Sequence, residues 1–142
     1  MQSSELEKNK AVVQRYFDEI QNAHSLDGID SIFAEDFVDH MASSGGLYLG
    51  GMDGLKRGYA TFLNAFPDVH VTVEDMIAEG DKVVAYKPVA GPHRGPHLGI
   101  PPTGKRAQWQ NIGIYRIKNG KIAEYCGLLD EMSLIRQLGA IT

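Results

Sequence analysis

The hydrophobic residues of this 142-residue chain change their spacing near Pro67, and that change limits the folds the chain can adopt. Before Pro67, apolar residues recur every three or four positions, as on one face of a helix. After it, Val69, Val71 and Val73 alternate with polar residues, which is typical of a half-buried strand. Helices followed by a run of strands favour an α+β domain in which a curved antiparallel sheet wraps around the N-terminal helices.

Four helices are predicted from the apolar spacing and from helix-end signals. The first follows a capping box formed by Ser4 and Glu7. Its apolar stripe consists of Val13, Tyr16, Phe17 and Ile20. The others begin near Ser25, at Asp53 as an N-cap before a stretch stopped by Pro67, and near Ser133 before Gly139.

Strands are predicted at residues 36–40, 69–73, 82–91, 106–117 and 122–130. Asn119 and Gly120 favour a two-residue type I′ hairpin turn between the last two strands. The chain contains no internal repeat, linker or low-complexity segment, so residues 1–142 are expected to form one domain.

Charge and composition exclude several partners. The net charge of −4 and pI near 5.7 argue against nucleic acid or an anionic membrane as the main partner. No apolar run of 18 residues could span a membrane, and the first ten residues contain no hydrophobic signal core. The single Cys126 cannot form an internal disulfide, which fits a reducing compartment. A cytoplasmic location is therefore expected.

Residues 91–105, GPHRGPHLGIPPTGK, place His93 and His97 four positions apart, a spacing that binds a metal ion when it occurs on a helix. Prolines and glycines throughout this segment prevent a helix. Neither a Cys nor a carboxylate stands nearby to complete a ligand set. We therefore predict a loop and no metal site.

The same segment, followed by NIGIYRIKNGKIAEYCGLLDEMSLIRQLG at residues 111–139, resembles the SnoaL-like polyketide cyclase family, within the larger group of NTF2-like folds. With FVDH and FPDVHVTVEDMIAEGDKVV, the resemblance covers roughly the whole chain. It implies a cone in which a bent sheet and helices enclose a mostly apolar cavity. Catalytic members include polyketide cyclases, ketosteroid isomerases, dehydratases and epoxide hydrolases, generally without metal or cofactor; other members only bind ligands or partners.

Two positions depart from the family. Alignment of the last strand puts Gly127 where characterised cyclases carry an acid–base aspartate, and Gly113 where they carry a histidine. Both changes remove proton-transfer groups, so the usual cyclase mechanism is not expected. Asp130 lies nearby, either as a substrate-binding residue or as the N-cap of the last helix.

His40 is predicted to replace them as the general base. The resemblance matches the end of FVDH to the strand position where ketosteroid isomerases carry their base, and a neutral imidazole with a pKa near about 6.5 can accept a proton. Strand alternation groups His40 with Val38 and Asp39 with Phe37, so only one of the two polar residues faces the cavity. We favour His40; the alternative is a structural, hydrogen-bonded histidine.

Lys87 and Tyr16 are the other predicted catalytic residues. Lys87 stands where family members commonly carry a large apolar residue. Facing inward, it would have a lowered pKa and could stabilise an enolate, donate a proton or form a Schiff base. Pro88 could instead turn it towards solvent. Tyr16 matches the region of the oxyanion-binding tyrosine of ketosteroid isomerases; core packing is its alternative role.

The resemblance implies that Trp109, Asn111 and Tyr125 line the cavity, with the two aromatic residues bounding a flat ligand and Asn111 holding a carbonyl or hydroxyl group. His93 is expected near the mouth and His97 at the rim. Gly113 and Gly127 leave room that either a ligand or packed side chains could fill.

The resulting hypothesis is a cofactor-free enzyme that transfers protons at carbon on a small apolar or aromatic carbonyl or hydroxylated substrate, by cyclisation, isomerisation, dehydration or retro-aldol cleavage. The alternative is a non-catalytic protein that binds a small molecule. A homodimer formed through the sheet face is expected in either case, because NTF2-like domains often pair this way.

Overall fold

The fold is known from a computed structural model that describes residues 2–40 and 50–140. The helical elements of these residues are α1 (Gln2–Arg15), the π-helical η1 (Tyr16–Gln21), α2 (Ile29–Ile32), α4 (Gly51–Ala65) and α5 (Glu131–Gln137). The strands are β1 (Phe33–Asp39), β2 (His70–Val71), β3 (Asp75–Glu79), β4 (Lys82–Tyr86), β5 (Val89–Pro92), β6 (Arg106–Trp109), β7 (Asn111–Lys118) and β8 (Lys121–Leu129).

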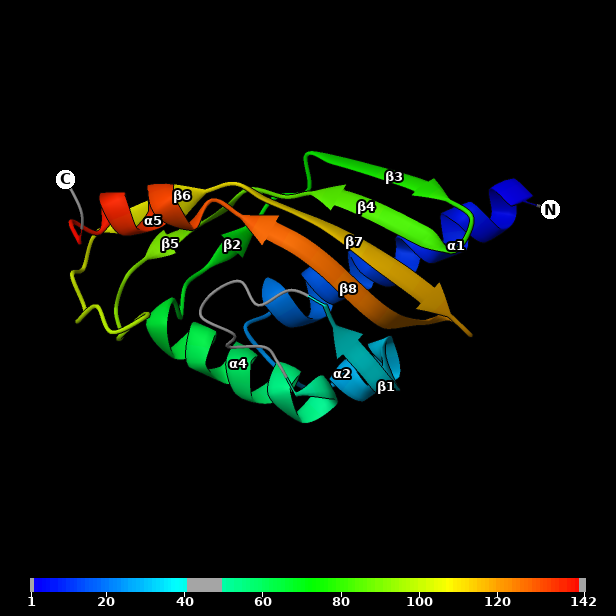
Figure 1. The fold of residues 1–142 in the computed structure, drawn as a ribbon, viewed down its shortest axis with the longest axis horizontal. Helices are drawn as coiled ribbons and strands as arrows, with labels where there is room; N and C mark the ends of the chain where they lie inside the picture. Colours follow the sequence, from blue (N-terminus) through cyan, green and yellow to red (C-terminus); the bar gives the residue numbers. More distant parts are fainter. Residues whose placement is uncertain (1, 41–49, 141–142) are drawn as a thin grey trace.

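The strands form one bent surface from two hydrogen-bonded sheets. The larger sheet has the order β1-β8-β7-β4-β3 and the smaller β2-β5-β6. The pairs are antiparallel except for β1 and β8, which run parallel. Strand β4 leads into β5 and β6 into β7 with one or two residues between, so the same two chain segments run through both sheets (Figure 1).

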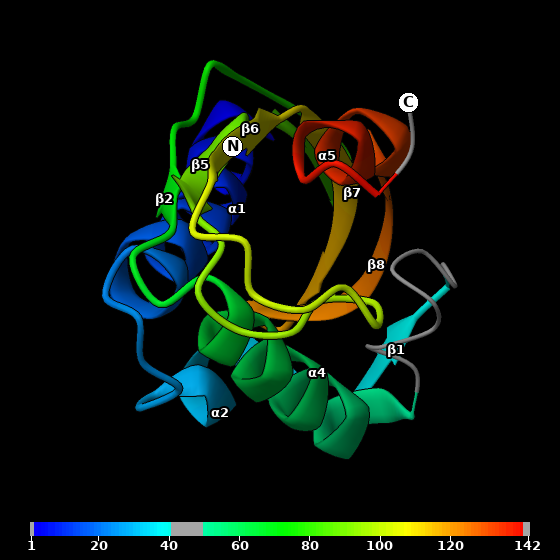
Figure 2. The ribbon, with the colours of Figure 1, turned by 90° about the vertical axis from the view of Figure 1, so that its left-hand side faces the viewer.

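The helices lie on the concave side of this surface. Viewed end-on, α1 and α4 lie opposite β7 and β8, and α5 lies across one end (Figure 2). Aromatic side chains fill much of the space between them. The Tyr16 ring packs edge-on against Phe33 with centroids 4.8 Å apart, and Phe17 packs in the same way on Tyr115 at 5.9 Å. The mixed α+β fold with a curved sheet is confirmed.

The predicted helices exist, with different starting points. Helix α1 already includes Gln2, so Ser4 lies inside it and the predicted capping box is wrong. Helix α4 begins after Gly50, which adopts a left-handed conformation, and Asp53 lies in the first turn instead of capping it. Helix α2 is shorter than predicted, because the chain is already extended at Phe33.

Two predicted long strands are interrupted. Residues 82–91 break at Lys87 and Pro88, because proline has no N–H to continue the ladder. The Lys87 N–H still donates to the Asn111 carbonyl at 2.8 Å, so the chain changes partner strand there without losing its hydrogen bonds. Residues 106–117 break at Gln110, whose carbonyl accepts a hydrogen bond of 2.9 Å from the Asp130 N–H.

Strand β3 was not predicted, because its side chains alternate only between exposed and half-buried positions. The predicted 69–73 strand is reduced to β2. The hairpin turn is confirmed: Asn119 and Gly120 both have positive φ, 53° and 76°, as a type I′ turn requires.

Candidate active site

A cavity of about 90 Å³ lies between the helices and the inner faces of both sheets. Most of its lining is aliphatic or aromatic. The titratable and amide groups among the lining residues include Tyr16, Asp39, Lys87, His97, Asn111 and Tyr125. The volume equals that of a few water molecules at about 30 Å³ each and is below the roughly 300–1,000 Å³ of a drug-sized site. The cavity therefore suits a small molecule or one part of a larger one.

Lys87 points into this cavity, and strand alternation explains why. Ala85, Lys87 and Val89 are all buried, so the inward positions continue across the break between β4 and β5. Pro88 does not turn the side chain to solvent. Only 3% of the Lys87 surface is exposed.

The Lys87 ammonium nitrogen lies among aromatic rings. Nζ is 4.6 Å from the ring centroid of Phe17, 5.8 Å from that of Tyr16 and 5.9 Å from that of Tyr115. It makes no hydrogen bond or ion pair with any residue that the structure describes. Because burial disfavours the charged form, the pKa of Lys87 falls from 10.5 to about 7.

Tyr16 and Gln21 face the cavity together because η1 is a π-helical turn. In such a turn residues five apart come into line, and the Gln21 Nε2 donates a hydrogen bond of 2.9 Å to the Tyr16 hydroxyl oxygen. The hydroxyl hydrogen of Tyr16 is therefore left to donate elsewhere. Burial raises the pKa of Tyr16, and the negative charge of Asp39 raises it further. The sequence offered no sign of the π-helical geometry.

The prediction that His40 faces the cavity is wrong. The predicted alternation along β1 is correct, but the inward face is the opposite one. Phe37 is buried and Asp39 lines the cavity, whereas Val38 is 45% exposed. His40 lies just beyond β1 with its side chain on the outer side. The sequence already contained a signal for this, since Phe33 shares the spacing of Phe37 and Asp39, and both phenylalanines are buried.

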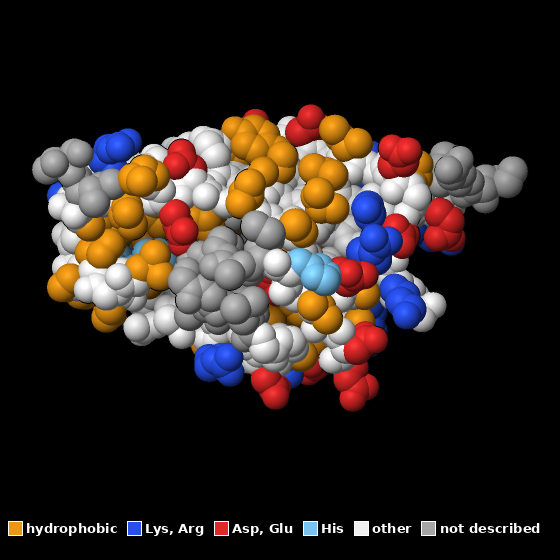
Figure 3. All heavy atoms as spheres, viewed as in Figure 1, with side chains coloured by type: hydrophobic (Ala, Val, Ile, Leu, Met, Phe, Trp, Pro, Cys, Tyr) orange, Lys and Arg blue, Asp and Glu red, His pale blue; other side chains and the backbone are white. Residues whose placement is uncertain are grey.

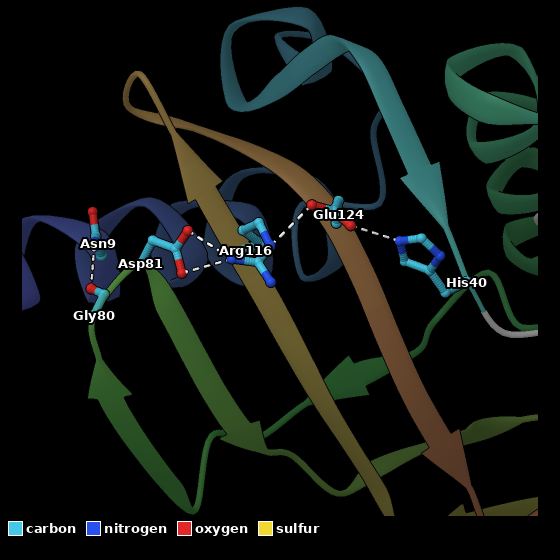
Figure 4. A network of polar contacts seen from close by, with 6 residues as sticks. All are labelled: Asn9, His40, Gly80, Asp81, Arg116 and Glu124. Carbon is cyan, nitrogen blue, oxygen red and sulfur yellow. Dashed lines mark hydrogen bonds and ion pairs between the residues drawn. The ribbon is translucent and has the colours of Figure 1, made fainter.

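His40 belongs to a chain of polar contacts on the outer surface (Figure 4). Its Nε2 lies 2.7 Å from Glu124, which also pairs with Arg116 at 2.9 Å. Arg116 in turn contacts both carboxylate oxygens of Asp81, at 2.9 and 2.7 Å. These side chains are 37–52% exposed, so this is a solvated network and not part of the cavity.

Tyr125 occupies the space beside the two glycines. A methyl group on Gly113 would overlap the Tyr125 ring, and one on Gly127 would overlap its hydroxyl end. The pairing of β7 with β8 places Gly113 opposite Gly127, and Tyr125 lies two residues earlier on the same face. A phenol therefore stands where the resemblance puts the missing aspartate and histidine. Burial raises the pKa of Tyr125, as do the nearby charges of Tyr16 and Asp39.

Asp39 lies close to three of the cavity phenols. It is the register partner of Tyr125 in the parallel β1–β8 pair. Burial is the main cause of the raised pKa of Tyr115, and the nearby Tyr125, Tyr16 and Asp39 groups raise it further. Asp39 is thus a carboxylate within electrostatic range of Tyr16, Tyr115 and Tyr125, at the edge of a mostly apolar cavity.

Trp109 and Asn111 line the cavity as predicted, from the two sides of the break at Gln110. The predicted positions of the two histidines are exchanged, because His97 lies at the cavity and His93 lies farther from it. His97 lines the cavity and packs on Phe66 at 5.3 Å, whereas His93 is fully buried behind the lining. Burial lowers the pKa of both imidazoles.

His93 is fixed by the loop instead of facing a ligand: its Nδ1 accepts a hydrogen bond of 3.2 Å from the Thr103 N–H. Asp130 does not line the cavity. Its carboxylate caps α5 by accepting from the Ser133 N–H at 3.0 Å, so the N-cap role is the one that the structure shows.

Residues 2–40 and 50–140 contain no group of three or more His, Cys, Asp or Glu side chains that could hold a metal ion. The same residues contain no helix that is both long and apolar enough to cross a membrane.

Comparisons with known proteins agree with this architecture. Residues 11–138 match the model of the SnoaL-like polyketide cyclase family. A nogalonic acid methyl ester cyclase of Streptomyces nogalater is 28% identical over 123 residues, which cover 83% of this chain and 88% of that protein.

Solved structures share the fold. AclR of Streptomyces galilaeus, a proposed hydroxylase, superposes with a TM-score of 0.84 at 25% identity, covering 96% of this chain and 83% of AclR. A proposed polyketide cyclase of Bacillus cereus gives 0.80 at 29% identity, covering 95% and 83%. Because the family match spans most of its length, the chain belongs to the SnoaL-like polyketide cyclase family. The resemblance in the sequence is thereby confirmed.

Proposed function

We propose that this protein is a cofactor-free enzyme that transfers a proton at the carbon next to a carbonyl group, on a small and mostly apolar or aromatic substrate. Aldol-type cyclisation, isomerisation, dehydration and retro-aldol cleavage all proceed through such a step. The observation that carries the proposal is the position of Asp39: a carboxylate lining an apolar cavity, close to several phenols.

In this mechanism Asp39 accepts the proton and the cavity stabilises the resulting enolate. The Tyr125 hydroxyl, beside Gly127, donates a hydrogen bond to the enolate oxygen. The Asn111 amide, whose Oδ1 has no hydrogen-bond partner among the described residues, holds a second polar group of the substrate. Trp109 bounds the apolar part. General acid–base catalysis contributes about 10²–10⁴-fold, and a preorganised oxyanion donor about 10²–10³-fold.

Family membership supports this class of reaction without naming the substrate. The relative from Streptomyces nogalater is a cyclase by name. Where the resemblance puts the acid–base residues of the characterised cyclases, this chain has glycines at positions 113 and 127, and a tyrosine fills the space beside them. Asp39 with Tyr125 is the pair that we assign to this role.

Hydrogen–deuterium exchange at carbon tests the proposal directly. A panel of small aliphatic and aryl ketones is incubated with the protein in D₂O, and deuterium uptake at the α carbon is followed by NMR. Asp39→Asn should lower the exchange rate at least about 100-fold, since the base is lost. His40→Gln, one residue away on the outer face, should keep the wild-type rate. Equal rates for wild type and Asp39→Asn would disprove the assignment.

A second candidate function is the binding of a small molecule without turnover. The observation that favours it is the loss of both proton-transfer groups at positions 113 and 127. It predicts that wild-type protein retains an apolar ketone in equilibrium dialysis, with no exchange above the buffer rate, and that Asp39→Asn retains it equally well.

We further infer a homodimer formed through the outer face of the larger sheet. Apolar side chains gather over β4, β7 and β8 in Figure 3. The exposed ones include Tyr86, Ile112, Ile114 and Leu128. Light scattering at micromolar concentration should give twice the monomer mass, and Ile114→Lys should give a monomer.

The unpaired, exposed Cys126 on the same strands supports a reducing compartment such as the cytoplasm.

A further inference from the structure

We propose that Lys87 is a nucleophilic catalytic residue that forms a Schiff base with an uncharged aldehyde or ketone in the cavity. The inference rests on the proposed function, because it assigns a covalent route to the same proton transfer. It also narrows the substrate class to carbonyl compounds whose carbonyl carbon can reach an amine inside an apolar site.

The geometry around Nζ carries this inference. A lysine that serves a structural purpose in a protein interior is normally paired with a carboxylate or hydrogen-bonded. Lys87 is 3% exposed, lines the cavity, and has aromatic faces as its near neighbours instead of an anion. Three ring centroids lie 4.6 to 5.9 Å from Nζ, and the same side chain lines the cavity, where a carbonyl compound would meet the amine.

The protonation state agrees with this geometry. An amine attacks a carbonyl only when it is unprotonated. With a pKa of about 7, roughly half of the Lys87 side chains carry a free amine at neutral pH, whereas an ordinary lysine has a free amine in fewer than about one molecule in a thousand.

The covalent steps balance without any oxidant or further reactant. The Lys87 nitrogen adds to the carbonyl carbon, and the oxygen takes up a proton to give a carbinolamine. Tyr16, whose hydroxyl hydrogen is not used by Gln21, donates a proton to that hydroxyl, which leaves as water to give a protonated imine; the later hydrolysis of the imine returns the proton to Tyr16. Asp39 then removes the α proton, and the electron pair of that C–H bond forms an enamine.

The enamine carbon can add to a second carbonyl group, forming a carbon–carbon bond; the reverse sequence cleaves one. Water hydrolyses the imine at the end and restores the Lys87 amine. The positive imine nitrogen would sit among the rings of Phe17, Tyr16 and Tyr115, whose faces attract cations. A carboxylic acid is a poor substrate for this site, because its anion would have to be buried near Asp39.

Reductive trapping tests the inference. Full-length protein is incubated with butanone, a small apolar ketone, and cyanoborohydride, and the mass gain is mapped by peptide mass spectrometry. We expect modification at Lys87 at pH 7 at least about tenfold faster than at any other lysine, with a rate that rises through pH 7. Lys87→Met should lose this label, and Lys82→Met, an exposed lysine of β4, should keep it.

Labelling spread evenly over surface lysines, or labelling at Lys87 that rises only above about pH 9, would overturn the inference. Near-ultraviolet circular dichroism checks that Lys87→Met is folded, which we expect because the change removes a buried charge. Deuterium exchange separates the two proposals. Exchange that depends on Asp39 but survives in Lys87→Met disproves the Schiff base alone, whereas trapping at Lys87 without any wild-type exchange disproves the proton transfer alone.

Discussion

On the same strands, titratable side chains face either the buried cavity or the solvent. Asp39 and His40 are neighbours in the chain, as are Glu124 and Tyr125. Asp39 and Tyr125 line the cavity, where burial and the other buried groups perturb the phenol. His40 and Glu124 contact each other at 2.7 Å in a half-exposed network.

Lys82 and Lys87, on the chain segment that runs from β4 to β5, show the same contrast. Lys82 is exposed at the outer end of β4, whereas Lys87, five residues later, is buried among rings. For a titratable side chain, the strand face on which it lies, more than the residue type, decides whether burial shifts its pKa. Variants on the two faces should therefore differ greatly in their effects.

The largest expected effect is that of Lys87→Met on stability near neutral pH. The folded-state pKa of Lys87 is lowered to about 7, so between about pH 7 and pH 10 the unfolded chain binds a proton that the folded chain does not. The free energy of unfolding of wild type should therefore rise with pH in this window. At pH 7, Lys87→Met should be more stable by a few kcal/mol, since one pKa unit corresponds to about 1.4 kcal/mol.

Urea unfolding of both proteins from pH 6.5 to 9.5 measures this difference. The gap between wild type and Lys87→Met should be widest at the acidic end and narrow as the pH rises. Lys82→Met should keep the slope of wild type. A wild-type stability that is flat across the window would contradict the buried, unpaired amine.

An intermediate effect is expected for Gly127→Ala. The added methyl group would overlap the Tyr125 hydroxyl end and press on the Ile112 carbonyl, so the ring must move. Overpacking of this kind costs about 1–3 kcal/mol. A double-mutant cycle with Tyr125→Ala measures the coupling: most of the cost of Gly127→Ala should vanish once the ring is gone. An equal cost in both backgrounds would show that Tyr125 does not occupy this space.

The smallest effect is expected on the outer face. Glu124→Gln breaks the contacts of Glu124 with His40 and Arg116, but these groups are 37–51% exposed. Exposed ion pairs are worth about 0–1 kcal/mol because water and salt screen them. The change in unfolding free energy should stay within about 1 kcal/mol and shrink in high salt. A loss well above 2 kcal/mol would erase the contrast between the two faces.

The fold class could be predicted because it depends on local periodicity. Helical spacing before Pro67 and alternation after it gave the order of helices and strands, and Asn119–Gly120 marked the hairpin turn. The breaks at Lys87 and Gln110 were missed because local alternation continues through them. Pro88 marks the first break in the sequence, whereas the change of hydrogen-bond partner at Gln110 has no local sequence signal.

The site was predicted in part, for a related reason. Alternation showed that Asp39 and His40 take opposite faces, and the structure agrees; of the two alternatives for Lys87, the inward one is observed. The choice between the two faces of β1 went wrong although Phe33 and Phe37 both pointed to Asp39. The pairing of Tyr16 with Gln21 and the filling of the glycine space by Tyr125 had no sequence signal.

The sequence by itself determined the family, the order of the predicted helices and strands, and which residues of a predicted strand share a face, because these follow from the residues and their spacing along the chain. Only the tertiary structure decided which side chains from distant elements meet in the cavity. It also decided that Lys87 meets three rings instead of solvent, and that a tyrosine fills the space beside Gly113 and Gly127. The physical reason is that these environments are created by residues distant in the chain, from η1 to β8, that meet only when the sheet bends over the helices.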